Sequence, residues 1–136
     1  IRCRAAKYWQ EALGDCTWLY PQLVREGNTH SYWTYAVVLE IEKVGWHEFR
    51  EKWKSLGGDG IYAAWKLSYQ EPMFREKAFL NREKLGIYDN YDYNQTVCPN
   101  AEFLQPRLLQ LKTNYYQEED IKKQAEILRQ MIEYFD

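Results

Sequence analysis

Residues 55–72, SLGGDGIYAAWKLSYQEP, hold the densest group of side chains in the sequence that could take part in chemistry. Three glycines within four positions could expose backbone N–H groups to a phosphate. Lys66 could form a Schiff base with a carbonyl compound if burial lowered its pKa. Tyr62, Trp65 and Tyr69 surround that lysine in the sequence and could bind a substrate or another protein surface.

The glycines are better explained as a helix end and a turn than as a phosphate loop. A phosphate loop needs a strand before its glycines and a helix after them. Here the order is reversed, because apolar residues at helical spacing predict a helix over residues 46–56, directly before Gly57 and Gly58. Asp59-Gly60 is typical of a turn into a following strand. We therefore expect Gly57 or Gly58 to have a positive φ as a helix cap.

The other polar residues favour structural roles. Lys66 is expected at the surface, with its stem along aromatic rings. His30 and His47 are too few and too isolated for a metal site, and neither has a neighbouring Ser or Cys that suggests a catalytic triad. The acidic run at 118–120 suits the positive end of a helix, and DNYDYN at 89–94 lacks the pattern of a calcium loop. The residues alone specify no reaction.

Length and composition indicate one domain with a hydrophobic core. The chain has 136 residues, 18 of them basic and 20 acidic, and no cluster of Lys and Arg indicates a nucleic acid or membrane partner. No apolar run is long enough to span a bilayer, and the first ten residues do not resemble a signal peptide. The three cysteines fit neither zinc nor redox motifs, which indicates free thiols and a cytoplasmic protein.

Hydrophobic spacing and turn residues place the elements that must position these side chains. In the first half of the chain, the expected elements are a helix over 2–13, a central strand over 32–42, a helix over 46–56 and a short strand after the glycine turn. A long loop over 75–97 leads to a helix from Cys98-Pro99 to about Gln105, with Ala101, Phe103 and Leu104 facing inward. A short strand over 107–113 and a helix over 117–135 complete the chain. This order predicts an α+β fold, a small and mostly antiparallel sheet covered by helices.

Aromatic residues are unusually frequent for so polar a chain. They make up 17% of the residues, including 12 Tyr and 6 Trp, although the mean hydropathy is −0.71. Tyr and Trp combine an apolar ring with a polar tip, so they suit surfaces that are half wet or buried only against a partner. We therefore expect the chain to be part of something larger. Several members of one set of aromatic residues are expected to be exposed in the chain alone: Tyr62, Trp65, Tyr69, Tyr88, Tyr91 and Tyr93.

Four segments cover nearly the whole chain: AAKYWQEAL, HSYWTYAVVLE, GWHEFREKWKSLGGDGIYAAWKLSYQEPMF and CPNAEFLQPRLLQLKTNYYQEEDIKKQAEILRQMIEYF. In this order they resemble the carboxy-terminal part of the DegT/StrS family of sugar aminotransferases. Members of that family use pyridoxal phosphate, have the aspartate aminotransferase fold and aminate keto sugars that are typically linked to a nucleotide. The resemblance implies that residues 1–136 are a single C-terminal small domain.

The resemblance also implies that the cofactor is held elsewhere. In that family, the lysine that carries pyridoxal phosphate, the acid that pairs with its ring nitrogen and the phosphate-binding groups lie in a large amino-terminal domain, which this chain lacks. Lys66 does not match the cofactor lysine. This chain is thus expected to bind no cofactor and to be inactive alone, with the large domain, a second subunit of a homodimer and a sugar nucleotide as its partners.

The small domain of such enzymes closes over the active site and helps to line the substrate pocket. The residues expected on the substrate side are Tyr62, Trp65, Lys66, Tyr69, Tyr32 and His30. Packing at a domain or subunit interface explains the same residues equally well. An alternative function also stays open, namely a stand-alone, non-enzymatic binding or dimerisation module that descends from such a domain.

Overall fold

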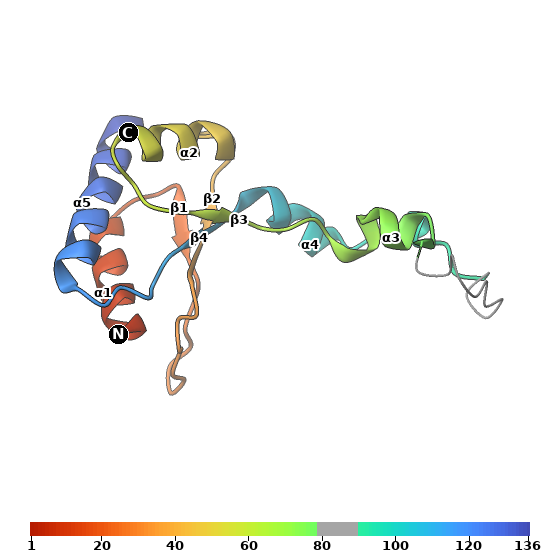
Figure 1. Cartoon of the computed structure of the whole chain (residues 1–136), viewed down its shortest axis with the longest axis horizontal. Helices are drawn as coiled ribbons and strands as arrows, with labels where there is room; N and C mark the ends of the chain where they lie inside the picture. The colour runs from red at the N-terminus through yellow and green to blue at the C-terminus, as the bar shows by residue number, and fades with distance from the viewer. Residues whose placement is uncertain (79–89) are drawn as a thin grey trace. The chain divides into compact units, whose positions relative to one another are not determined.

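The computed structural model describes residues 1–78 and 90–136, which fall into two compact units. Unit 1 comprises Ile1–Ala64 and Arg107–Asp136, and unit 2 comprises Trp65–Pro106. The expectation of a single domain over residues 1–136 stays a prediction. The elements of unit 1 are α1 (Arg2–Leu13), β1 (Leu19–Pro21), β2 (Tyr35–Leu39), α2 (Trp46–Ser55), β3 (Tyr62–Ala63), β4 (Leu108–Leu111) and α5 (Glu118–Phe135), labelled in Figure 1.

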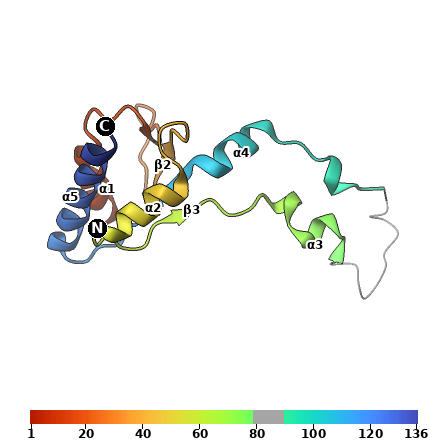
Figure 2. The ribbon, with the colours of Figure 1, turned by 90° about the horizontal axis from the view of Figure 1, so that it is seen from above.

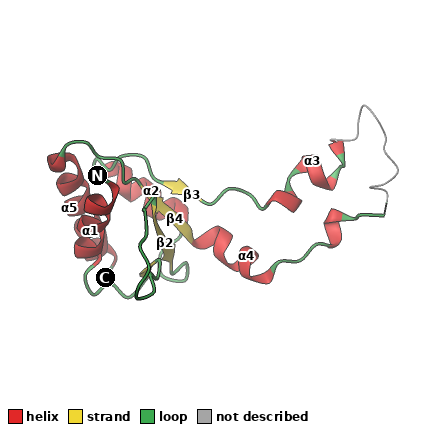
Figure 3. Ribbon diagram, turned by 90° about the horizontal axis from the view of Figure 1, so that it is seen from below, coloured by secondary structure: helices red, strands yellow, loops and turns green. Residues whose placement is uncertain are grey.

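Unit 1 is built on a four-stranded antiparallel sheet of order β1-β2-β4-β3. The strands are short compared with the helices and loops around them (Figure 3). Successive side chains of a strand point to opposite faces, and Val37 lies opposite Leu109 on the buried face. The expected α+β class, the antiparallel pairing and the central place of β2 are confirmed.

Helices α1 and α5 lie side by side, as Figures 1 and 2 show from two directions, and α2 packs against α5. Each helix has apolar residues at spacings of three and four, so its buried side chains form one stripe. The stripe on α1 consists of Ala5, Ala6, Trp9, Ala12 and Leu13, as the sequence predicts. The stripe on α5 includes Ile121, Ala125, Leu128 and Met131. None of the helices in the described ranges is long and apolar enough to cross a membrane.

The predicted strand over 32–42 is too long at both ends. Tyr32 has a φ of 50°, which lies in the left-handed region and is incompatible with a strand, so β2 begins only at Tyr35. The chain between β1 and β2 instead extends beyond the sheet as a long hairpin (Figure 1). The sequence also gave no signal for β1, because its three residues include a proline.

The glycine turn ends α2 as expected. Gly57 has a φ of +83°, and its N–H donates to the carbonyl of Lys54. Gly58 has a different requirement, because a Cβ at that position would lie 2.2 Å from Nε1 of the fully buried Trp53. The first glycine is therefore needed for its backbone angle and the second for close packing.

Gly58→Ala should destabilise the chain by about 1–3 kcal/mol, because the added methyl group overlaps a tryptophan ring that has no room to move. The measurement is the free energy of urea unfolding. Gly60→Ala, in the same turn, is the matched control, since its Cβ would meet only Tyr62 Oη at 3.8 Å and its φ is not in the left-handed region. Equal stability of the two variants would contradict the packing argument.

Unit 2 contains η1 (Ser68–Gln70), α3 (Pro72–Arg75), η4 (Tyr93–Gln95) and α4 (Pro99–Leu104), and η5 (Gln105–Arg107) leads from it into β4. None of its described residues, 65–78 and 90–106, is buried. The expected start of α4 at Cys98-Pro99 is confirmed, but Phe103 and Leu104 are exposed rather than inward-facing. Phe103 and Leu104 have no core to pack against, because α4 has only six residues and the described part of unit 2 contains no buried residue. Residues 79–89 of the long loop predicted over 75–97, Tyr88 among them, lie outside the described residues, and the rest of that loop contains the short turn η4.

Glu118, in the first turn of α5, joins this helix to α1. Its carboxylate accepts hydrogen bonds from Tyr8 at 2.5 Å and Lys122 at 2.9 Å, and Arg4 lies 3.5 Å away. The hydrogen bond from Tyr8, followed by Lys122 and Arg4, lowers the pKa of Glu118 below its usual value of 4.5. A lowered pKa means that this group stabilises the fold above pH 4.5 and that the stabilisation is lost as the pH falls through the folded-state pKa.

Glu118→Gln should therefore reduce the loss of unfolding free energy between about pH 5 and pH 3. Urea unfolding at several pH values measures the slope of unfolding free energy against pH. Glu133→Gln is the matched control on the same helix, because the described residues include no ion partner for Glu133. If both variants keep the slope of the parent chain, the contacts of Glu118 do not contribute to acid stability.

Candidate functional site

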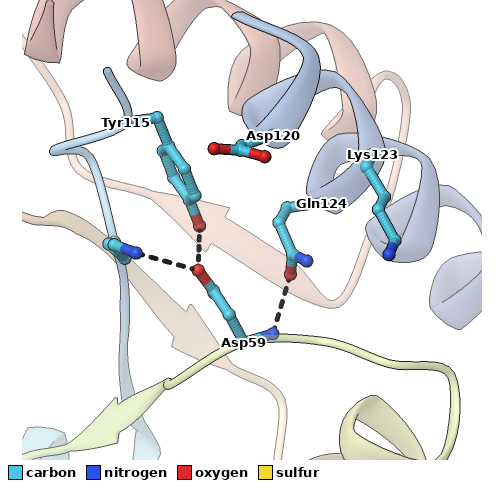
Figure 4. Close-up of a pocket in the computed structure, with 6 residues that line it drawn as sticks. Asp59, Tyr115, Asp120, Lys123 and Gln124 are labelled. Carbon is cyan, nitrogen blue, oxygen red and sulfur yellow. Dashed lines mark hydrogen bonds and ion pairs between the residues drawn. The ribbon is translucent and has the colours of Figure 1, made fainter. Parts of the chain in front are cut away.

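Asp59 is the best-anchored residue of the glycine turn (Figure 4). Its N–H donates to Oε1 of Gln124 on α5 at 2.8 Å, and its carbonyl accepts a hydrogen bond from Nε1 of Trp53 on α2 at 2.8 Å. Gln124 is buried and also lies 3.5 Å from the carbonyl of Gly57. Hydrogen bonds from two helices thus fix the backbone just before β3.

The carboxylate of Asp59 completes this anchor. Its Oδ2 accepts a hydrogen bond from the hydroxyl of Tyr115 at 2.8 Å and pairs with Nζ of Lys112 at 3.3 Å. Burial, together with the negative charge of Asp59, raises the pKa of Tyr115 far above its usual value, so this hydroxyl is a donor at every physiological pH. The ammonium of Lys112 also lies 4.7 Å from the ring of Tyr115. Residues 56 positions apart in the chain thereby form one polar cluster.

A small open pocket of about 210 Å³ lies beside this cluster (Figure 4). Its lining residues are Asp59, Lys112, Tyr115, Asp120, Lys123 and Gln124. The pocket does not fit pyridoxal phosphate, because Lys112 and the carboxylate of Asp59, both partly exposed, already pair with each other, and Asp120 adds negative charge to a cavity that would have to take a phosphate. Within the described ranges, no group of three His, Cys, Asp or Glu residues could hold a metal ion. The cluster is thus built to hold the turn.

Asp59→Ala should cost about 1–3 kcal/mol of unfolding free energy, since it leaves the buried hydroxyl of Tyr115 without an acceptor. A double-mutant cycle with Tyr115→Phe isolates this interaction, and we expect the double variant to be clearly more stable than the sum of the two single effects indicates. The measurement is chemical unfolding of all four proteins. Additive effects would show that the two side chains do not depend on each other.

The residues predicted from the aromatic run are exposed or half-buried. Tyr62, on the edge strand β3, is 62% exposed, and Trp65 is 87% exposed with Lys66 exposed beside it. Tyr69 is half-buried and donates a hydrogen bond to Glu102 at 2.5 Å, which raises the pKa of Tyr69 to about 12. Tyr69 thus joins η1 to α4 within unit 2, while Trp65 and Lys66 present their side chains to solvent.

The two residues predicted before β2 are brought together. The rings of His30 and Tyr32 lie 4.5 Å apart, and Nδ1 of His30 accepts a hydrogen bond from the N–H of Tyr32 at 2.9 Å. Tyr32 also stacks on the buried Tyr35, with 5.9 Å between ring centroids. The hydroxyl of Tyr35 is buried and has no hydrogen-bond partner within the described part of the chain, and burial raises its pKa to about 12.

Sequence reasoning missed Asp59, Tyr115 and Trp33. An Asp flanked by glycines predicted a turn but not the side chain's partner, because Tyr115 lies in a different loop. Trp33 was placed inside a strand, where its side chain would have pointed to one face of the sheet, whereas it lies in the hairpin loop and is 78% exposed. The left-handed Tyr32 before it has no sequence signal, since tyrosine seldom adopts that conformation.

Comparison with known proteins supports the fold, an α+β arrangement with a four-stranded antiparallel sheet. Among solved structures, a GDP-4-keto-6-deoxymannose-3-dehydratase with a trapped pyridoxal phosphate–glutamate geminal diamine is similar to this chain, with a TM-score of 0.57 and 18% identity. The match covers 94% of this chain but 30% of that one, so the chain spans less than a third of its neighbour. No protein-family model and no curated protein matches the sequence.

Proposed function

We propose that this chain is the C-terminal small domain of a pyridoxal-phosphate-dependent enzyme that acts on a nucleotide-linked keto sugar, as sugar aminotransferases of the DegT/StrS type do. The observation that carries the proposal is the similarity in fold over nearly the whole chain to an enzyme that is named for a GDP-linked keto sugar and whose structure holds a trapped pyridoxal phosphate–glutamate geminal diamine. The ordered segments of the sequence support the same assignment. Amino transfer is the reaction that these segments favour.

The cofactor is assigned to a large domain of the same protein, outside these 136 residues. When bound there, pyridoxal phosphate supplies the electron sink for chemistry at the carbon next to nitrogen. This chain's residues contribute surface. Trp65 and Lys66 are exposed, and Tyr62 is exposed on an edge strand, so they are available to line a substrate pocket or to pack against the large domain or a second subunit of a homodimer.

Exposed large apolar side chains are denser among the described residues of unit 2 than in the longer unit 1. Its described residues include six that are exposed: Trp65, Met73, Tyr91, Val97, Phe103 and Leu104. A segment that buries none of its described residues gains little stability from its own contacts. Unit 2 is therefore best understood as surface that the rest of the protein or its substrate covers, which supports a role as part of an enzyme over a free-standing module.

In the complete enzyme, Trp65→Ala should raise KM for the keto sugar nucleotide by about tenfold while kcat changes little, because a contact made equally in ground and transition states affects affinity alone. Tyr69→Phe should act more weakly, since it loses only the hydrogen bond to Glu102. The measurement is steady-state formation of 2-oxoglutarate from glutamate. Tyr134→Ala, at an exposed site on α5, is the control.

The same assay tests the proposed function itself. A gene product that contains this chain and binds pyridoxal phosphate, yet transfers no amino group to any nucleotide-linked keto sugar, would contradict it. Weaker cofactor binding with an unchanged KM in Trp65→Ala would place this residue away from the sugar. A chain that is translated by itself and binds a partner without the cofactor would favour the stand-alone module.

A further inference from the structure

Trp33 is an exposed side chain that is held in place. It is 78% exposed, yet the guanidinium carbon of Arg2 lies 4.6 Å from the centroid of its ring. Nη1 of the same arginine donates hydrogen bonds to the carbonyl of Trp33 and, at 2.9 Å, to the hydroxyl of Thr113. Arg2 therefore fixes both the ring and the backbone of this residue from the start of α1.

The backbone on both sides of Trp33 is fixed as well. The buried hydroxyl of Thr113 lies 2.7 Å from the carbonyl of Tyr32 and 3.0 Å from that of Trp33. On the other side, the hydroxyl of Thr34 donates to the carbonyl of Leu111 at 2.9 Å. Hydrogen bonds to the end of β4 and to the loop after it therefore hold residues 32–34 in place.

This arrangement carries a cost that burial of Trp33 does not offset. Tyr32 adopts a left-handed conformation, which costs a non-glycine residue about 1–2 kcal/mol. Strain of this kind persists where surrounding contacts over-determine the backbone, and it is concentrated at ligand-binding sites. A rigid, exposed aromatic ring binds more tightly than a mobile one, because less side-chain freedom is lost on binding.

The charge beside the ring indicates what kind of ligand it would bind. Arg4, two residues further along α1, pairs with Glu118 at 3.5 Å. Arg2 forms no ion pair with any carboxylate in residues 1–78 or 90–136. An arginine with only neutral partners next to a flat, open aromatic face suits a ligand that has a planar ring and carries negative charge.

We propose that Trp33 and Arg2 bind the nucleoside diphosphate part of the substrate. The base stacks on the face of Trp33 that Arg2 leaves open, and the positive charge of Arg2 attracts the phosphates. Thr113 is a positioning residue, since it holds the carbonyls of Tyr32 and Trp33, which lie on either side of the Trp33 side chain. This inference rests on the proposed function and specifies which residues recognise the nucleotide.

The test is a titration of the chain with GDP, followed by the NMR signal of the Trp33 indole N–H, which is assigned from its loss in Trp33→Phe. We expect a saturable shift of this signal. Trp33→Ala should weaken GDP binding about tenfold or more, as expected when a stacked ring is removed, whereas Trp33→Phe retains part of the affinity. Tyr116→Ala is the matched control, because Tyr116 is also an aromatic residue that is 78% exposed. Calorimetry supplies the affinities of the variants.

Two further comparisons separate the contribution of charge to GDP binding from the contribution of stacking. Arg2→Gln should weaken GDP binding more than guanosine binding, and added salt should weaken GDP binding in the parent chain. Thr113→Val should weaken both ligands alike, since it loosens the platform without removing charge. Thermal unfolding of each variant shows whether the fold is intact, and Trp33→Ala should unfold within a few degrees of the parent because so little of the ring is buried.

The inference is overturned if GDP causes no saturable shift, if Trp33→Ala binds as the parent does, or if a neutral monosaccharide such as mannose binds equally well. Its failure differs from that of the proposed function. If the enzyme is active but its small domain does not bind GDP, only the Trp33 site is refuted. If GDP binds through Trp33 but the protein has no activity on keto sugars, only the proposed reaction is refuted.

Discussion

The structure of unit 1 depends on how the chain is held between α2 and β3. At Asp59 the amide, the carbonyl and the carboxylate each have a partner in a different segment: Gln124 on α5, Trp53 on α2, and Tyr115 with Lys112 in the loop after β4. Directly before it, Gly58 allows the backbone to lie against the ring of Trp53. This one residue fixes where the chain enters β3 and therefore where the aromatic run begins.

Periodic parts of the fold follow from the sequence, whereas long-range polar contacts do not. The bounds of α1 and the buried stripe of α5 could be predicted because each helix carries its own apolar spacing. The pairing of Asp59 with Tyr115 could not, since nothing local links two loops so far apart in the chain. The left-handed conformation of Tyr32 could not be predicted either, because the contact with Thr113 holds it and the residue's own preference is against it.

The candidate site shows the same difference between features that the sequence predicts and features that depend on long-range contacts. Composition correctly indicated exposed aromatic rings, and Tyr62, Trp65 and Tyr91 are exposed in the structure. Which exposed ring is rigid depends on contacts with Arg2 and Thr113, and these single out Trp33, which the sequence had placed in a strand. Each unit presents its own kind of surface: unit 1 has an exposed aromatic ring held by contacts, and unit 2 has exposed apolar side chains and no core among its described residues.

The central claim is that this chain is one part of a pyridoxal-phosphate enzyme and that another part holds the cofactor. The most direct measurement is borohydride reduction of the full-length gene product with bound pyridoxal phosphate, followed by peptide mass spectrometry. We expect a single modified lysine outside these 136 residues. Stoichiometric modification of one lysine within them, whether Lys66 or Lys112, would contradict this assignment.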